Sequence, residues 1–316
     1  MALLKAVLKV AVSALLIWFL LRGTDLDLLW AQVTGIGIFA FVIASCLIGG
    51  LCFPAAVRWR WVLGILGRAI GLGDALRIVA IGLFFNQVLP SSVGGDAVRM
   101  WLAHRAGIEP RTAVTSVVID RALGLSVVFL MTAAALPWLL PLVPRAELRA
   151  AFMLVSLGGL VGIGALCLLD RFARLLPRWT LIVWVEALAS GWRALLISRI
   201  GFRAVALSIA MQVIFALAVF VLGFSLDLGI ALFDCLILVP PVVLMMALPI
   251  SIAGWGVREG AMVVMFGFIG ISDHDALALS VLVGAATLAG SLPGGAVWLV
   301  TGAARWRAAE RGGDKT

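Results

Sequence analysis

The sequence has no tyrosine, two histidines and few charged residues. Charged side chains occupy 13% of its 316 positions, about half of the roughly 25% typical of soluble domains. Apolar residues occupy 64%. One water-soluble core cannot bury that much apolar surface, so the composition excludes a soluble protein and predicts one that uses the bilayer as its solvent.

Metal-binding and nucleophilic patterns are also missing. The four cysteines lie in apolar stretches without CxxC or Cys/His spacing, and no HExxH occurs, so we expect no zinc site, cofactor, disulfide framework or catalytic residue. The net charge of +8 does not indicate nucleic acid, because the basic residues fall in short loops between apolar runs. That distribution is typical of inner-membrane proteins.

Apolar runs long enough to cross a bilayer need about 20 residues. We predict six full spans, the first of them a retained helix because no small-residue cleavage site follows it. The segment 179–197 has one polar face and is expected to lie in the membrane interface. The predicted spans are 4–21, 34–55, 112–136, 150–169, 203–224 and 277–301.

Two further apolar regions, 74–104 and 231–271, are each broken midway by proline and glycine. Irregular backbone at membrane depth requires burial in protein or a wet cavity. We therefore predict an all-α polytopic membrane protein in which both regions are re-entrant hairpins that enter and leave on the same side.

Placing both termini in the cytoplasm puts nineteen of the 24 basic residues on the cytoplasmic side, as the positive-inside rule requires. The helices that precede the two hairpins then run in opposite directions, which predicts an inverted repeat with a substrate site between its halves. The predicted units are an N-terminal helix 1–33, a first repeat 34–136, a linking span and interfacial helix 137–202, an inverted second repeat 203–304, and a cytoplasmic tail 305–316.

The broken regions share a pattern. "LPSSVGGDAVR" (89–99) and "LPISIAGWGVR" (248–258) match at six of eleven positions without a gap. In each, proline ends one helix and glycines permit a turn. The amides at the start of the next half-helix can then bind an anion.

Arginine near that helix start suits a phosphate, because its planar guanidinium donates two parallel hydrogen bonds. Arg99 could alternatively be a cytoplasmic anchor. Asp96 and Glu259 could hold the arginines, pair with each other across the repeat, take up a proton, or act as structural salt-bridge partners.

A second polar pair, Asp120–Arg121, lies inside a predicted span. Its residues either form an internal ion pair or line the cavity. Asn86 precedes the first proline and is expected to bind freed backbone groups or line the cavity, and "SLPGG" (291–295) is interpreted as close helix packing. The predicted substrate-binding residues are Asn86, Ser91, Ser92, Gly94, Gly95, Asp96, Arg99, Asp120, Arg121, Ser251, Gly254, Arg258 and Glu259.

"NQVLPSSVGGDAVR", the Asp120–Arg121 pair, "LPISIAGWGVREGA" and "SLPGG" together resemble the lysylphosphatidylglycerol synthase transmembrane-region family, also called flippase-like proteins. The resemblance implies a lipid-translocating fold with two re-entrant segments. Bifunctional members carry a separate aminoacyltransferase domain. This chain ends at Thr316, so we expect no aminoacyl transfer by it.

The leading hypothesis is a flippase or scramblase in the bacterial inner membrane. It would move an anionic phospholipid or a polyprenyl- or hopanoid-type lipid, with the head-group phosphate held by Arg99, Arg258 and half-helix amides. The alternatives are a proton-coupled transporter of a small anion, a lipid-modifying membrane enzyme, and a non-catalytic partner of a lipid- or glycan-modifying enzyme. A homo-oligomer is a further possibility.

Overall fold

The computed structural model describes residues 35, 37–89, 94–166, 180–247 and 256–313. Every regular element within these ranges is a helix, as predicted for an all-α membrane protein. Five helical stretches are long and apolar enough to cross a bilayer, and they coincide with five of the six predicted spans. They are Ile38–Ile65, Pro110–Leu142, Ala146–Leu166, Arg199–Ser225 and Asp273–Thr301. The predicted span 4–21 lies outside the described residues.

The first described span is interrupted once. Helix α3 (Ile38–Gly50) ends and α4 (Cys52–Ile65) begins around Leu51, where Pro54 has no amide to donate back to Gly50. The helix then continues to Ile65, ten residues beyond the predicted end at 55, because no proline or glycine interrupts it before Gly64. This extension brings Arg58 and Trp59 into the protein interior.

Both proline- and glycine-broken regions form pairs of short helices. The first comprises α5 (Leu72–Val88) and α6 (Gly94–Arg105), and the second α12 (Leu232–Met246) and α13 (Val257–Gly267). None reaches the roughly 20 residues of a full span. Gly82 on α5 lies against both Gly95 and Arg99 on α6, so α6 returns alongside α5 as a hairpin.

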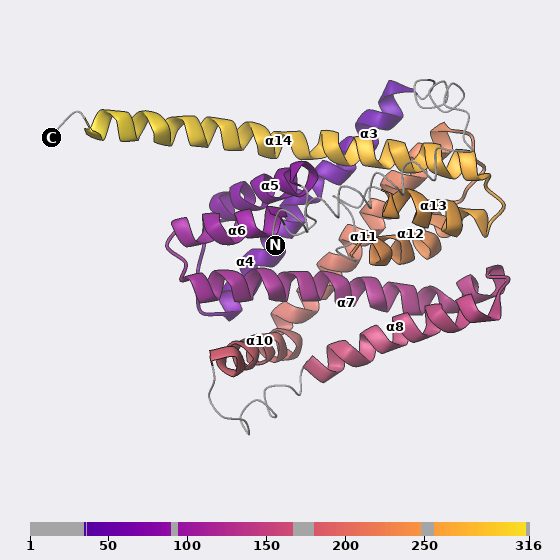
Figure 1. Cartoon of the computed structure of the whole chain (residues 1–316), viewed down its shortest axis with the longest axis horizontal. Coiled ribbons are helices and arrows are strands. Elements are labelled where there is room, and N and C mark those ends of the chain that lie inside the picture. The colour runs from indigo at the N-terminus through magenta and orange to yellow at the C-terminus, as the bar shows by residue number, and fades with distance from the viewer. Residues whose placement is uncertain (1–34, 36, 90–93, 167–179, 248–255, 314–316) are drawn as a thin grey trace, which may run out of the picture.

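The two hairpins are placed between two long helices, α7 (Pro110–Leu142) and α14 (Asp273–Gly313). In the first hairpin α5 packs on α14 and α6 on α7, whereas in the second α12 packs on α7 and α13 on α14. Figure 1 shows the hairpins at opposite ends of this arrangement, with α3–α4 and α11 (Arg199–Ser225) crossing between them.

Small residues allow the close helix contacts of this core. Gly294 on α14 lies directly against the carbonyl oxygen of Ala80 on α5, and Gly49 on α3 lies against Gly290 on α14. A methyl group at any of these glycines would overlap the facing backbone. The packing role predicted for the glycines of "SLPGG" is therefore confirmed, and α14 remains helical through Pro293.

Two helices lie at the edge. Helix α8 (Ala146–Leu166) runs beside α7 and is largely exposed. Helix α10 (Thr180–Ile197) corresponds to the segment 179–197 and is seen nearly end-on in Figure 1, at an angle to α7 and α14. Trp192 and Leu195 on α10 are buried in a cluster with residues of α4 and α7. Its position in the membrane interface stays a prediction.

Candidate functional site

A chain of ion pairs connects the first hairpin to the helices on either side of it. Arg58 on α4 donates from Nε to Asp120 Oδ1 on α7 at 2.7 Å, and from Nη1 to the Ser208 hydroxyl on α11 at 2.9 Å. Arg99 on α6 donates from Nη2 to Asp120 Oδ2 at 3.1 Å. One carboxylate therefore bridges two arginines from two different helices.

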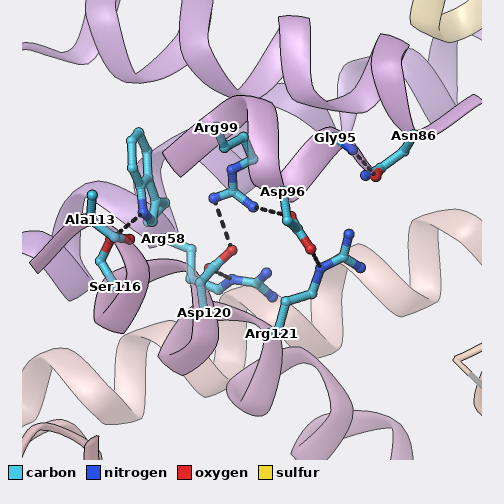
Figure 2. A network of polar contacts seen from close by, with 10 residues as sticks. Arg58, Asn86, Gly95, Asp96, Arg99, Ala113, Ser116, Asp120 and Arg121 are labelled. Atoms are coloured by element: carbon cyan, nitrogen blue, oxygen red, sulfur yellow. Dashed lines mark hydrogen bonds and ion pairs between the residues drawn. The ribbon is translucent and has the colours of Figure 1, made fainter. Parts of the chain in front are cut away.

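The chain continues through a second carboxylate. Asp96 accepts from Arg99 Nη1 at 3.4 Å and from Arg121 Nε at 2.5 Å. Figure 2 shows the resulting order Arg58–Asp120–Arg99–Asp96–Arg121, with cations and anions alternating. We call these five residues the first-hairpin network. Asp120 and Arg121 are adjacent in sequence, yet Asp120 pairs with arginines of α4 and α6 and Arg121 with Asp96 of α6, so their ion pairs are made with other helices.

The network is buried at one end and open at the other. Side-chain exposure is 3% for Asp120, 5% for Asp96 and 8% for Arg99, but 50% for Arg121. Within the described residues, three guanidinium groups of the network face two carboxylates, which leaves one net positive charge. Buried ionisable groups in membrane proteins are costly and usually functional. Among the described residues, the buried Nε of Arg99 has no hydrogen-bond partner.

Local structure fixes Arg99 in this position. Its guanidinium lies 5.1 Å from the ring centroid of Trp59, a cation–π contact. Trp59 is fully buried and donates to the Ser116 hydroxyl at 3.1 Å. The methylene groups of Arg99 lie where a side chain on Gly82 would be. A glycine is therefore required on α5 at this point.

The start of α6 is held by the last turn of α5. Asn86 Oδ1 accepts from the Gly95 amide at 2.9 Å, which satisfies one of the free amides of a helix N-terminus. Figure 2 shows this bond beside Asp96. The expectation that Asn86 binds backbone groups is thus confirmed, and Asn86 positions the helix that carries Asp96 and Arg99.

The second hairpin has a smaller polar cluster. Arg258 donates from Nη2 to Glu259 Oε1 at 2.5 Å and from Nε to the Ser280 hydroxyl at 3.3 Å. Glu259 Oε2 also accepts from the Gly256 amide, so the carboxylate caps α13 as well as pairing with Arg258. We call Arg258, Glu259 and Ser280 the second-hairpin network. Its one cation and one carboxylate balance.

The structure brings together six of the predicted residues, which are Asn86, Gly95, Asp96, Arg99, Asp120 and Arg121. Gly94 is the first residue of α6. Arg258 and Glu259 lie in the other hairpin, whose helices pack on α7 and α14 and form a network of their own. Ser91, Ser92, Ser251 and Gly254 lie outside the described residues. Asp96 and Glu259 hold the arginines of their own hairpins, one of the alternatives left open by the sequence.

Sequence reasoning missed Arg58. It lies beyond the predicted end of a span and close to Arg60, which favours an exposed position, but it is only 9% exposed. The uninterrupted helical stretch between Pro54 and Gly64 is the sequence signal that predicts its place on the span. Arg99 is also buried, at 6% exposure, which does not fit the alternative of a cytoplasmic surface anchor.

The chain matches the family described as lysylphosphatidylglycerol synthase TM region over residues 6–294. It belongs to that family. The matched range contains both hairpins and all residues of both networks, so the geometry described above lies within the transmembrane region that defines the family.

A relative in this family is the UPF0104 membrane protein of Archaeoglobus fulgidus, which is 25% identical over 115 residues. The alignment covers 36% of this chain and 34% of the relative, so the chain matches about a third of the relative's length. Family membership and the five apolar spans together establish a multi-pass membrane protein.

Proposed function

We propose that this member of the lysylphosphatidylglycerol synthase transmembrane-region family moves an anionic phospholipid, or a polyprenyl- or hopanoid-type lipid, between the leaflets of the bacterial inner membrane. The head-group phosphate would bind at the first-hairpin network. The observation that carries this proposal is the charge imbalance there, with three arginines facing two aspartates. A phosphodiester brings one negative charge and would neutralise the network.

Arg121 would make the first contact with the head group. Half of its side chain is exposed, while Asp96 occupies its Nε. A phosphate can accept two parallel bonds from a guanidinium and would compete with Asp96 for Arg121. Arg99 lies one step deeper, and its buried Nε, which has no partner within the part of the chain that the structure describes, is a further donor. The balanced second-hairpin network is better suited to holding its hairpin than to binding a second anion.

We also infer that the two halves form an inverted repeat. The reciprocal packing of the hairpins supports this, since α5 and α12 each lie on the long helix of the other half. The sequence alignment of the two halves supports it too. The offset in residue number that aligns Arg99 with Arg258 also aligns Arg121 with Ser280. Transporters with this construction bind substrate between their repeats and expose it to the two sides in turn.

The test is lipid translocation in proteoliposomes that contain head-group-labelled phosphatidylglycerol. Arg121→Gln keeps a polar side chain and removes its charge, and because Arg121 lies at the open end, the Arg58–Asp120–Arg99 pairs stay in place. The matched control is Arg77→Gln, which removes an arginine from an exposed ion pair with Asp74. We expect Arg121→Gln to slow translocation about tenfold or more, since a hydrogen bond to a charged group contributes roughly 1.5–3 kcal/mol, and Arg77→Gln to behave as wild type.

Equal translocation by both variants would contradict the proposed role of the network. Uptake of inorganic phosphate without movement of lipid would instead favour the proton-coupled transporter of a small anion.

A further inference from the structure

A groove of about 440 Å³ lies between α3, α5 and α14. Small residues create it, because Gly49 and Gly290 bring the backbones of α3 and α14 together at its base. The walls are almost entirely apolar and include Phe41, Leu83 and Ala289. Its volume falls within the range of roughly 300–1,000 Å³ found for small-molecule sites.

The groove follows α3 and the start of α4. Along α3 and the start of α4 its lining extends from Phe41 to Cys52, eleven residues or about 16 Å at 1.5 Å per residue. That length is close to half of the roughly 30 Å hydrocarbon core. Arg58 follows six residues after Cys52 on α4, about 9 Å further along the helix.

The groove and the network approach each other at Cys52. Cys52 lines the groove and packs against the buried cluster that contains Trp59, and the Arg99 guanidinium lies 5.1 Å from the Trp59 ring centroid. A cationic network with one excess positive charge therefore lies beyond the Cys52 end of an apolar groove that is about one leaflet long. This combination complements an anionic amphiphile.

We propose that the groove holds one acyl or polyprenyl chain of the lipid whose phosphate the first-hairpin network binds. The inference rests on the proposed function and adds the position of the tail. With the predicted cytoplasmic N-terminus, α3 runs inward, so the network lies on the cytoplasmic side of the groove. The bound lipid is then oriented as in the cytoplasmic leaflet.

The dimensions suit an extended hydrocarbon chain, because the groove has a volume of about 440 Å³, almost entirely apolar walls and a length of about 16 Å.

The test uses the full chain in proteoliposomes with phosphatidylglycerol that carries a photoreactive diazirine on one acyl chain, and locates the cross-links by mass spectrometry. Cys46→Phe with Ala289→Phe fills the groove, since both residues line it. Ile43→Phe with Leu299→Phe adds the same bulk to α3 and α14 at lipid-facing positions that are 49% and 70% exposed. We expect the groove-filled variant to lose at least nine-tenths of the labelling at Leu83, and the control to retain it.

A neutral diacylglycerol with the same diazirine separates this inference from the head-group proposal. It should label Leu83 in wild type and in Arg121→Gln alike, because the groove does not depend on the phosphate. If this labelling persists while no variant moves phosphatidylglycerol, the groove assignment stands and the head-group assignment fails. Unchanged labelling in the groove-filled variant overturns the groove assignment. So does efficient disulfide formation between Cys46 and a cysteine introduced at Leu8, Val12 or Leu15.

Discussion

Asp120→Asn removes the charge that holds Arg58 and Arg99 together. The carboxylate is 3% exposed, and its two partners are 11% and 8% exposed, so water cannot replace it at either arginine. Asparagine has nearly the same shape and still offers one acceptor oxygen. The substitution therefore tests the buried charge itself, with little change in packing.

The expected cost is large because the two arginines remain buried. Removing one partner of a buried ion pair costs about 3–5 kcal/mol, and here one substitution leaves two cations without their shared carboxylate. The matched control is Asp74→Asn. Asp74 pairs with Arg77 at 2.9 Å, close to the 2.7 Å of Arg58–Asp120, but the two side chains are 53% and 35% exposed. An exposed pair of this kind contributes about 0–1 kcal/mol.

The free energy of unfolding, measured in mixed micelles by titration with a denaturing detergent, gives the comparison. We expect Asp120→Asn to lower it by about 3–5 kcal/mol and Asp74→Asn by no more than about 1 kcal/mol. A second variant, Arg58→Met with Asp120→Asn, removes one of the unpaired cations and should recover part of the loss. Equal costs for the two asparagine variants would refute the reasoning that Asp120 stabilises the fold through buried charge.

Two further substitutions test packing around the networks. Gly284→Ala places a methyl group against the Arg258 guanidinium in the second-hairpin network and should destabilise the protein by about 1–3 kcal/mol. Gly260→Ala places its methyl group in open space and should be neutral or stabilising. Thermal unfolding of the two variants checks this, and equal midpoints would contradict it. Trp59→Phe removes the bond to Ser116 at 3.1 Å and should cost about 1–3 kcal/mol, while Trp138→Phe at a 55% exposed site should cost little. An equal decrease in the free energy of unfolding in the two tryptophan variants would contradict a specific role for the Trp59–Ser116 hydrogen bond.

The spans could be predicted because the bilayer imposes a length. Any helix that crosses it needs about 20 apolar residues, and the runs at 112–136 and 203–224 agree with α7 and α11 to within a few residues at most ends. The hairpin positions could be predicted for a related reason, since proline combined with several glycines disfavours a continuous helix, although Pro293 lies within α14 without ending it. Both signals are local in the sequence.

The partners within the networks could not be predicted in this way. Arg58 and Asp120 are 62 residues apart, and Arg58 and Ser208 are 150 apart, so these contacts depend on how α4, α7 and α11 pack. The adjacency of Asp120 and Arg121 was misleading, because neighbouring residues on a helix point in different directions. The charge imbalance between the two hairpins became visible only when Arg58 was placed in the interior.

The same imbalance explains why Arg121 is a better functional probe than Asp120. Loss of Asp120 is expected to weaken the fold, so a loss of transport in Asp120→Asn would have two causes. Arg121 is half exposed and bonded to one carboxylate, and its charge can be removed with the Arg58–Asp120–Arg99 contacts left in place.

The most direct test of the central claim, that the first-hairpin network binds a lipid phosphate, is the affinity of the purified protein for phosphatidylglycerol relative to diacylglycerol with the same acyl chains. The measurement is native mass spectrometry of wild type, Arg121→Gln and Arg77→Gln. The account predicts that wild type and Arg77→Gln prefer phosphatidylglycerol, and that Arg121→Gln loses about tenfold or more of that preference while its affinity for diacylglycerol is unchanged. An equal preference in all three proteins would contradict it.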